Sequence, residues 1–343
     1  MVFGLTGDGR GLALVLWRCG LLWLALLLTG CGAGAGYDVY QGATMGTVYR
    51  VSARCPADAD SAIQGELALV NQAMSTYEQD SELSQFNQHA PNAWVPVSGE
   101  LFSVMQVAQQ LSRVSGGAFD VTVGPLVNAW GFGPAIADAA KPSAAELAAA
   151  FNRVGYEKLR LRENPPALQK LADVYVDLSA IAKGYGVDRV AERLLRDGCS
   201  DFMVEVGGEV TVRGVNPQGQ PWRVGIEVPD LRRVGDVHRV LALRDMAVAT
   251  SGDYRNYVEH DGQRYSHTID PRNGEPVRHA LASVTVIHKT ALWADAYATA
   301  ISVLGPEAGW RFAEAENLAA LFIVRGANGF DERYTAPMHQ FLQ

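Results

Sequence analysis

The chain has 343 residues, of which 48% are hydrophobic and 19% charged, an ordinary globular composition with enough apolar residues for a large core. One large domain and two closely packed lobes are both compatible with this length. The formal net charge of −8 argues against a protein that binds nucleic acid through its phosphates, because such binding needs a basic surface.

The first thirty residues have the pattern of a secretion signal. Arg10 and Arg18 precede the apolar run CGLLWLALLLTGC, which is short for a membrane span but fits the hydrophobic part of a signal peptide. The end of the run, Leu28 to Cys31, resembles the lipobox of bacterial lipoproteins, in which the cysteine becomes the lipidated first residue. A plain secretory peptide with a chance cysteine is the alternative.

We therefore expect a lipoprotein signal peptide over residues 1–30, a flexible linker over 31–36 and a folded domain over 37–343. Lipidation of Cys31 would anchor this domain to a membrane of the cell envelope on the periplasmic side. It would leave Cys55 and Cys199, which cannot form a disulfide framework or a cysteine metal cluster. Whether these two cysteines pair is not decided by the sequence.

In the first half of the domain, residues 37–53 alternate as a strand or hairpin with a turn at Met45 to Thr47. Helical spacing covers residues 58–76, and the polar segment 74–88 is typical of a helix that passes into a loop. A second amphipathic helix is expected over 99–115.

Glycines and prolines in AFDVTVGPLVNAWGFGP, residues 118–134, predict a shaped loop. Ser143 and Glu146 have the spacing of a capping box for a helix over 143–152. Residues 175–198 predict a short strand that runs into a helix, and 201–214 a pair of strands broken by two glycines.

In the last third, WRVGIEVP, VLALRDMAVATS, LASVTVIH and AALFIVR read as strands, and ALWADAYATAISVLG reads as a helix that Gly305 and Pro306 close. Along the sequence the predicted strands follow one another in runs, with helices between the runs. This order predicts an α+β or mixed α/β fold.

Asp295 and Thr299 lie four residues apart in this last helix, so both side chains share one helix face, about 6 Å apart at Cβ. A carboxylate and a hydroxyl that converge are suitable ligands for Mg²⁺. Alternatively, Thr299 bonds back into its own helix and Asp295 is solvated. The apolar neighbours of Asp295 favour a partner for its carboxylate.

The segment DLSAIAKGYG places Asp177 and Lys183 around a predicted helix start, where backbone amides favour an anion, although Asp177 is equally suited to cap the helix. The spacings of a Walker loop and of a Rossmann fingerprint are missing. Gly207 and Gly208 fit either the close approach of a flat ligand or a bulge. Ser251 fits a phosphate contact or a turn.

Residues 266–277, SHTIDPRNGEPV, place His267, Asp270 and Arg272 on a turn that Pro271 and the Asn-Gly pair make stiff. His267 fits a general base, a metal ligand or a strand histidine with satisfied hydrogen bonds. The motifs of serine hydrolases and zinc enzymes are missing from the chain.

Taken together, several motifs in this order resemble the ApbE family of FAD:protein FMN transferases, from about residue 40 to about residue 325. They are MGTVYRV, MSTY, GGAFDVTVGPLVNAWGFGP, VDLSAIAKGYGVDRV, VEVGGEV, TSGDYRNY, HTIDPRNGEPV and ADAYATAI. The resemblance implies two lobes with antiparallel-rich sheets and FAD in the cleft between them. It also implies Mg²⁺-dependent transfer of FMN from FAD to a threonine hydroxyl of an acceptor protein, with release of AMP.

The resemblance also implies the site residues and partners. Metal ligands fall on Ala180 through its backbone oxygen, Asp295 and Thr299, with the Ala298 carbonyl as a possible fourth. Flavin contacts fall on Met45, Tyr77, Ala118, Phe119, Asp120, Asp177, Lys183, His267 and Ile269. The implied acceptors are subunits of membrane redox complexes of the Nqr and Rnf kind.

For the proton of the incoming threonine, we expect His267 or Asp270 to act as the base, since the stiff turn would hold either within reach. Two other functions stay open: an FAD pyrophosphatase that uses water as the acceptor, and a flavin-binding lipoprotein without turnover. A carrier has no need of a metal at the diphosphate.

Overall fold

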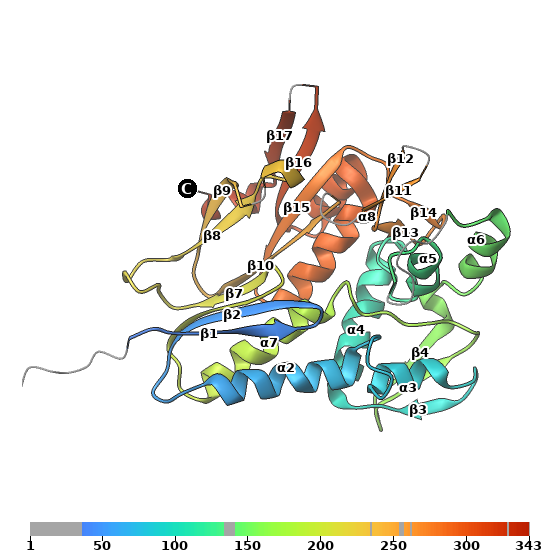
Figure 1. Ribbon diagram of the computed structural model, residues 1–343, viewed down its shortest axis with the longest axis horizontal. Coiled ribbons are helices and arrows are strands. Elements are labelled where there is room, and N and C mark those ends of the chain that lie inside the picture. The colour runs from blue at the N-terminus through green and yellow to red at the C-terminus, as the bar shows by residue number, and fades with distance from the viewer. Residues whose placement is uncertain are drawn as a thin grey trace, which may run out of the picture. The chain divides into compact units, whose positions relative to one another are not determined.

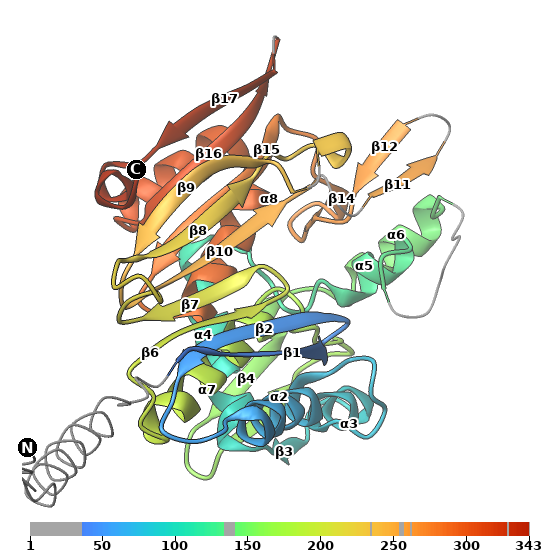
Figure 2. The same ribbon diagram turned by 60° about the vertical axis from the view of Figure 1, so that its left-hand side comes forward.

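An antiparallel sheet of eight strands organises the fold, with the spatial order β1-β2-β6-β7-β10-β15-β16-β17 (Figures 1 and 2). Its strands are β1 (Asp38–Thr44), β2 (Thr47–Arg54), β6 (Asp201–Val206), β7 (Glu209–Arg213), β10 (Met246–Gly252), β15 (Leu281–His288), β16 (Ala319–Gly326) and β17 (Gly329–Tyr334). Segments from both ends of the domain therefore share one sheet.

The computed structural model describes residues 36–133, 141–233, 235–253, 257–260, 263–327 and 329–342. The unit from Tyr37 onward is compact by itself, apart from Met1–Gly36. Cys31, the expected lipidation site, lies outside the described residues. Among the described residues no helix is both long and apolar enough to cross a membrane.

Helices pack on one face of the sheet, with α7 against β6 and β7 and α8 against β10 and β15. The helices are α2 (Asp60–Met74), α3 (Glu82–Gln88), α4 (Gly99–Val114), α5 (Gly124–Ala129), α6 (Ala144–Phe151), α7 (Ala182–Arg196) and α8 (Ala291–Ala315). Short 3₁₀ turns cover Tyr156–Lys158, Leu231–Arg233 and Ala336–Phe341.

A hairpin of β8 (Trp222–Glu227) and β9 (Val237–Leu243) covers the other face of the sheet. Trp222 and Ile226 of β8 join a core cluster with Val212 and Val248 of the sheet. Because side chains alternate between the two faces of a strand, each face of the sheet has its own hydrophobic layer.

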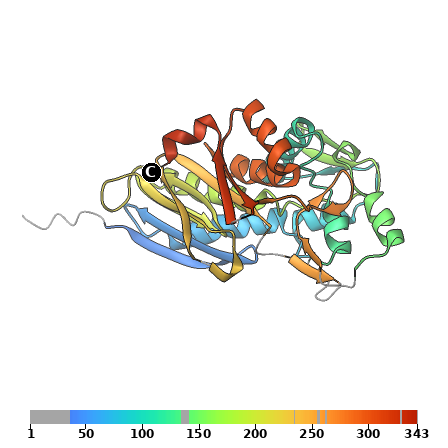
Figure 3. The ribbon, with the colours of Figure 1, turned by 90° about the horizontal axis from the view of Figure 1, so that it is seen from above.

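Three smaller sheets complete the described part of the domain. They are β3-β5-β4 (Trp94–Pro96, Ala167–Lys170, Leu159–Arg162), the hairpin β11-β12 (Tyr257–His260, Gln263–Ser266) and the hairpin β13-β14 (Ile269–Asp270, Glu275–Pro276). Helices α5 and α6 lie at the end of the body that is away from β8-β9 (Figures 1 and 3).

Helices α7 and α8 cap each other through buried carboxylates. Asp188 of α7 accepts hydrogen bonds from the backbone N–H of Ala291 and Leu292, both at 2.8 Å. In return, Asp295 of α8 accepts one from the N–H of Gly184 at 3.1 Å. Free N–H groups at a helix start attract negative charge, so this exchange fixes the two helices against each other.

Most predicted elements are confirmed, and so is the mixed α/β class with its antiparallel sheet. The predicted strands at 222–229, 281–288 and 319–325 are β8, β15 and β16. The capping box of α6 is present, with Glu146 N–H bonded to the Ser143 hydroxyl and Ser143 N–H bonded to the Glu146 carboxylate.

Two predictions in the first half were wrong in detail. The polar segment 74–88 is not all loop, because α3 forms there with Ser81 as its N-cap. Residues 118–134 contain the short helix α5. Local composition hides both helices, since they are short and stabilised by their packing.

Three predictions in the second half also differ. The strand predicted just before α7 does not form, and residues 174–178 pair with no other strand. The N–H of Val176 bonds instead to the Asn87 side chain. A turn with Asp245 at φ 54° splits the run 240–251 into β9 and β10. Gly305 breaks α8 as predicted, at φ 79°, but helical structure resumes at once and ends at Ala315.

Cys55 and Cys199 form a disulfide that joins the end of β2 to the turn before β6, 144 residues apart in sequence. Because such a crosslink restricts the unfolded chain, we expect the Cys55→Ser, Cys199→Ser double variant to lose about 2–5 kcal/mol of unfolding free energy. Urea denaturation of both proteins, with and without reductant, measures this. Reductant should destabilise only the parent, and equal midpoints for parent and variant would contradict the prediction.

Candidate active site

A cavity of about 1090 Å³ opens where β6, β7, β8 and β10 meet the starts of α7 and α8 and the turn near residue 267. Its wall brings together most residues that the sequence singled out. These are Tyr77, Ala118, Phe119, Asp120, Asp177, Ala180, Lys183, His267, Ile269, Asp295 and Thr299.

Three predicted site residues are not on this wall. The Met45 side chain packs against Gly186 of α7, while its neighbour Thr47 lines the cavity. Ala298 is fully buried inside α8. Asp270 is buried in its own turn. A flavin contact by Met45 and a metal contact by Ala298 therefore have no support from the cavity's shape.

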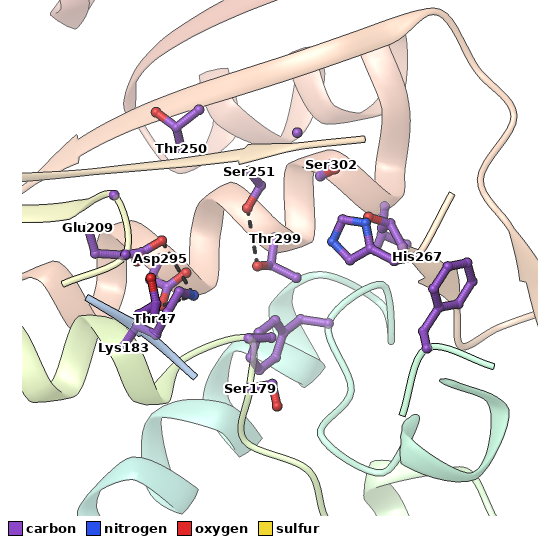
Figure 4. A pocket seen from close by; sticks show the side chains of 18 of the residues that line it. Thr47, Ser179, Lys183, Glu209, Thr250, Ser251, His267, Asp295, Thr299 and Ser302 are labelled. Carbon is purple, nitrogen blue, oxygen red and sulfur yellow. Dashed lines mark hydrogen bonds and ion pairs between the residues drawn. The ribbon is translucent and has the colours of Figure 1, made fainter. Parts of the chain in front are cut away.

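A buried cluster of charges lies at one side of the cavity (Figure 4). The Lys183 ammonium is 3.4 Å from a Glu209 oxygen and 3.7 Å from an Asp295 oxygen. Two carboxylates thus share one ammonium. The second Glu209 oxygen, Oε2, is buried and has no hydrogen-bond partner.

Burial and charge together determine the protonation of this cluster. Burial raises the pKa of Glu209 to about 8, and Lys183 only partly offsets that effect. Burial likewise raises the pKa of Asp295. The two carboxylates outweigh the burial of Lys183, so its pKa is raised and it stays charged. The carboxyl group of Glu209 therefore loses its proton less readily than a solvent-exposed carboxyl would.

This cluster predicts a pH-dependent stability. The pKa of Glu209 is higher in the folded protein than in the unfolded chain. Its contribution to the unfolding free energy is therefore complete below about pH 4.5 and is lost as the pH rises through about 8. We expect the unfolding free energy of the Glu209→Gln variant to fall less between pH 5 and about 8 than that of the parent. Denaturant titrations across this range measure the two slopes, and parallel slopes would contradict the prediction.

Hydroxyl groups follow the cluster along the cavity. Thr299 lies one helical turn after Asp295, and its hydroxyl is 3.3 Å from that of Ser251 on β10. Figure 4 shows this pair between the charged cluster and His267. The shared helix face that the spacing predicts is thus present, and both Asp295 and Thr299 reach the cavity wall.

The residues predicted to contact the flavin differ in exposure and in their other roles. Tyr77 is 69% exposed at the cavity, whereas Phe119 is 1% exposed. Asp120 accepts hydrogen bonds from Thr122 N–H at 2.7 Å and Tyr156 N–H at 2.8 Å, and burial raises its pKa. Asp120 therefore also ties two loops together.

Asp177 holds the turn before α7 by accepting hydrogen bonds from the N–H of Ser179 at 2.8 Å and its hydroxyl at 2.6 Å. Asp177 does not cap α7 itself, because Ile181 is the N-cap position and the partner of Asp177 is Ser179 in the preceding turn. The free anion site expected at this helix start is partly filled by the carboxylate of Asp295.

The turn after His267 is as rigid as its sequence predicts. Asp270 accepts hydrogen bonds from the Arg272 backbone N–H at 2.9 Å and from its guanidinium at 2.8 and 2.7 Å. Gly274, at φ 78°, closes the turn with an N–H bond to the Asp270 carbonyl. His267 lines the cavity, with its ring 6.3 Å from that of Phe132. The turn therefore presents His267 to the cavity and keeps Asp270 for its own structure.

Two parts of the site were not predicted from the sequence. Glu209 directly follows the Gly207-Gly208 pair that the sequence analysis singled out. An acidic residue between this pair and an apolar strand was the sequence signal that could have identified Glu209 as a site residue. The other part is the wall formed by Arg223 to Glu227 of β8, which is far along the chain and has an ordinary strand pattern.

Comparisons with known proteins agree with this fold and site. A model of the ApbE family matches residues 45–322. The FAD:protein FMN transferase of Vibrio cholerae is 44% identical over 92% of this chain and 96% of its own length. The protein of the same name from Escherichia coli is 38% identical over 95% of this chain and 97% of its own length.

Solved structures are similar over the same extent. The flavin transferase ApbE from Vibrio cholerae has a TM-score of 0.83 at 42% identity, covering 90% of this chain and 100% of that one. The ApbE protein from Thermotoga maritima has a TM-score of 0.79 at 30% identity, covering 90% of this chain and 99% of that one.

Proposed function

Because the chain belongs to the ApbE family, whose matched relatives are FAD:protein FMN transferases, we propose that this enzyme transfers FMN from FAD to a threonine hydroxyl of an acceptor protein. In this reaction the threonine oxygen bonds to the phosphorus of the FMN half, the bond to the AMP phosphate breaks, and AMP leaves. The observation that carries the proposal is one cavity that holds Asp295, Thr299 and His267 together.

We further propose that Mg²⁺ assists the transfer, with Asp295, Thr299 and the Ala180 backbone as its protein ligands. The described residues hold no group of three His, Cys, Asp or Glu side chains arranged for a metal. However, Mg²⁺ often takes one or two carboxylates and completes its shell with water and substrate phosphates. One carboxylate and one hydroxyl on a single helix face fit that requirement, and the ion would supply charge neutralisation at the diphosphate.

The groups that could neutralise a diphosphate at this wall already have partners, which supports a cation there. Glu209 and Asp295 share a single ammonium, and the backbone N–H of Gly184 already has a carboxylate partner. A diphosphate that approaches this wall would therefore meet little free positive charge, which is unfavourable in a partly buried site. A divalent cation beside Asp295 would supply that charge.

His267 is the base in this proposal. It reaches the cavity from a rigid turn, whereas Asp270 is held by Arg272 and does not line the cavity. The imidazole accepts the threonine proton as the oxygen attacks phosphorus. The fixed turn keeps the imidazole in one place, which is what a transfer that depends on positioning requires.

For the cellular setting we propose a lipoprotein that is anchored through Cys31 to a membrane and faces the periplasm. Its acceptors are proposed to be Nqr-type and Rnf-type redox subunits that carry the target threonine. The apolar run and the Leu28 to Cys31 segment support the anchor. Palmitate labelling of the full chain, compared with Cys31→Ala, tests it: label that persists in the variant contradicts lipidation at this residue.

The function is tested with the full-length protein in detergent, FAD, Mg²⁺ and the soluble domain of an Nqr-type subunit that contains the target threonine. Intact-mass analysis of the acceptor should show the gain of one FMN, which EDTA prevents. Free FMN and AMP without that gain would identify an FAD pyrophosphatase instead. FAD that stays bound and unchanged would leave only a carrier.

A further inference from the structure

Within the described part of the chain, one edge of strand β8 pairs with no other strand. Its residues pair with β9 along one side, in a register that runs from Trp222 opposite Leu243 to Glu227 opposite Val237. Among the described residues no strand pairs with the other side of β8. In an antiparallel strand, alternate residues point their N–H and C=O groups to each side, so over Arg223 to Ile226 this edge carries backbone groups that pair with no strand.

The same strand forms part of the reaction cavity. Five consecutive residues, Arg223 to Glu227, line its wall. Gly225 has no side chain, so what it presents to the cavity is main chain. The side chains of Trp222 and Ile226 are buried against the large sheet, which anchors the strand from beneath. The wall is therefore a strand that the large sheet supports from beneath, and Figure 2 shows where β8 lies relative to that sheet.

The cavity lies at the upper end of the usual size of small-molecule sites. Small-molecule sites usually measure about 300–1,000 Å³, and this one is about 1090 Å³. Met203 and Glu205 of β6 line the cavity as well, from the large sheet. A transfer between FAD and a protein needs room for both substrates in one cavity. The six residues of β8 span about 20 Å, enough for a segment of five or six extended residues.

We propose that the acceptor protein binds here as an extended segment, which pairs its backbone with the free edge of β8 and thereby places its hydroxyl side chain in the cavity. This inference rests on the proposed function, because the segment is the second substrate of that reaction. Strand addition to an exposed sheet edge is a general mode of peptide recognition, in which main-chain hydrogen bonds supply affinity. It lets one enzyme accept different proteins that share a short segment around the hydroxyl.

The test compares the intact Nqr-type domain with an eleven-residue synthetic peptide centred on its threonine, using the full-length enzyme, FAD and Mg²⁺. Single N-methyl groups are placed on successive peptide bonds. Strand pairing uses every second N–H, so methylation at alternate positions should raise the KM for the peptide by about tenfold, the equivalent of one lost hydrogen bond. The intervening positions should stay within about twofold of the parent peptide.

Hydrogen exchange gives a second readout that does not depend on turnover. The domain with its threonine replaced by alanine should slow exchange at alternate amides of residues 222–227, and FAD alone should not. Protection of other surfaces with none in β8, or N-methyl effects without alternation, would overturn the proposal. So would efficient transfer to the domain with none to the peptide, because a folded surface would then be recognised. If neither is modified, the proposed function itself fails.

Discussion

Replacing Asp295 with Asn should lower the rate of FMN transfer by about a thousandfold, which corresponds to about 4 kcal/mol of transition-state stabilisation. Asparagine keeps an oxygen that can accept the Gly184 N–H bond, so the contact between α7 and α8 persists. What it removes is the charge that would hold Mg²⁺ beside the diphosphate. Lys183 keeps Glu209 as a partner at 3.4 Å, so the variant leaves no unpaired ammonium.

Asp188 supplies the matched control for this experiment. It also joins α7 to α8 by accepting backbone N–H bonds, and burial raises its pKa to about 6, but it is not on the cavity wall. The Asp188→Asn variant should lose one of the two backbone hydrogen bonds and with it about 1–2 kcal/mol of stability. The folded variant should transfer FMN at nearly the parental rate. Mass analysis of the acceptor over time measures transfer, and calorimetric titration with Mg²⁺ and FAD measures binding.

Two results would contradict the role of Asp295. One is an Asp295→Asn protein that transfers FMN within about tenfold of the parent, since loss of a metal ligand is expected to have a larger effect. The other is an equal loss of transfer in the Asp188→Asn variant. In that case the effect would come from the helix contact and not from the cavity.

Where chemistry depends on local spacing, the sequence predicted the site. Asp295 and Thr299 share a face because one helical turn separates them, whatever the rest of the fold does. The turn at 270–274 is rigid because of its own Pro, Asn and Gly residues, and the structure shows the expected tight backbone bonds. The predicted bounds of β15 agree with those in the structure for a similar reason. All eight of its residues are buried or nearly buried, as is typical of a central strand.

Features that depend on distant segments were beyond local reasoning. The disulfide needs β2 and the turn before β6 to be neighbours, which is a property of strand order. The importance of Glu209 appears only when α7 and α8 bring Lys183 and Asp295 to it. The β8 wall depends on a hairpin folding across the sheet. Asp270 is a different case: its nearness in sequence to His267 suggested a shared role, and in the fold its carboxylate bonds to the Arg272 guanidinium.

The choice between His267 and Asp270 can be settled by replacing each of them with asparagine. His267→Asn removes the group that can accept the threonine proton, and we expect transfer to fall by about 10²–10⁴-fold. Asp270→Asn removes a negative charge that holds the Arg272 guanidinium but leaves the His267 imidazole in place. We expect that change to reduce transfer by no more than about tenfold, through a looser turn.

Binding and stability distinguish a chemical role from a positioning role. Flavin fluorescence should give FAD affinities close to the parental value for both variants, while thermal unfolding should show a lower midpoint for Asp270→Asn because its turn loses charge-assisted bonds. A large loss of transfer in Asp270→Asn with normal stability would make Asp270 the base. Normal transfer in both variants would place the base elsewhere on the cavity wall, since a proton must still leave the threonine as its oxygen bonds to phosphorus.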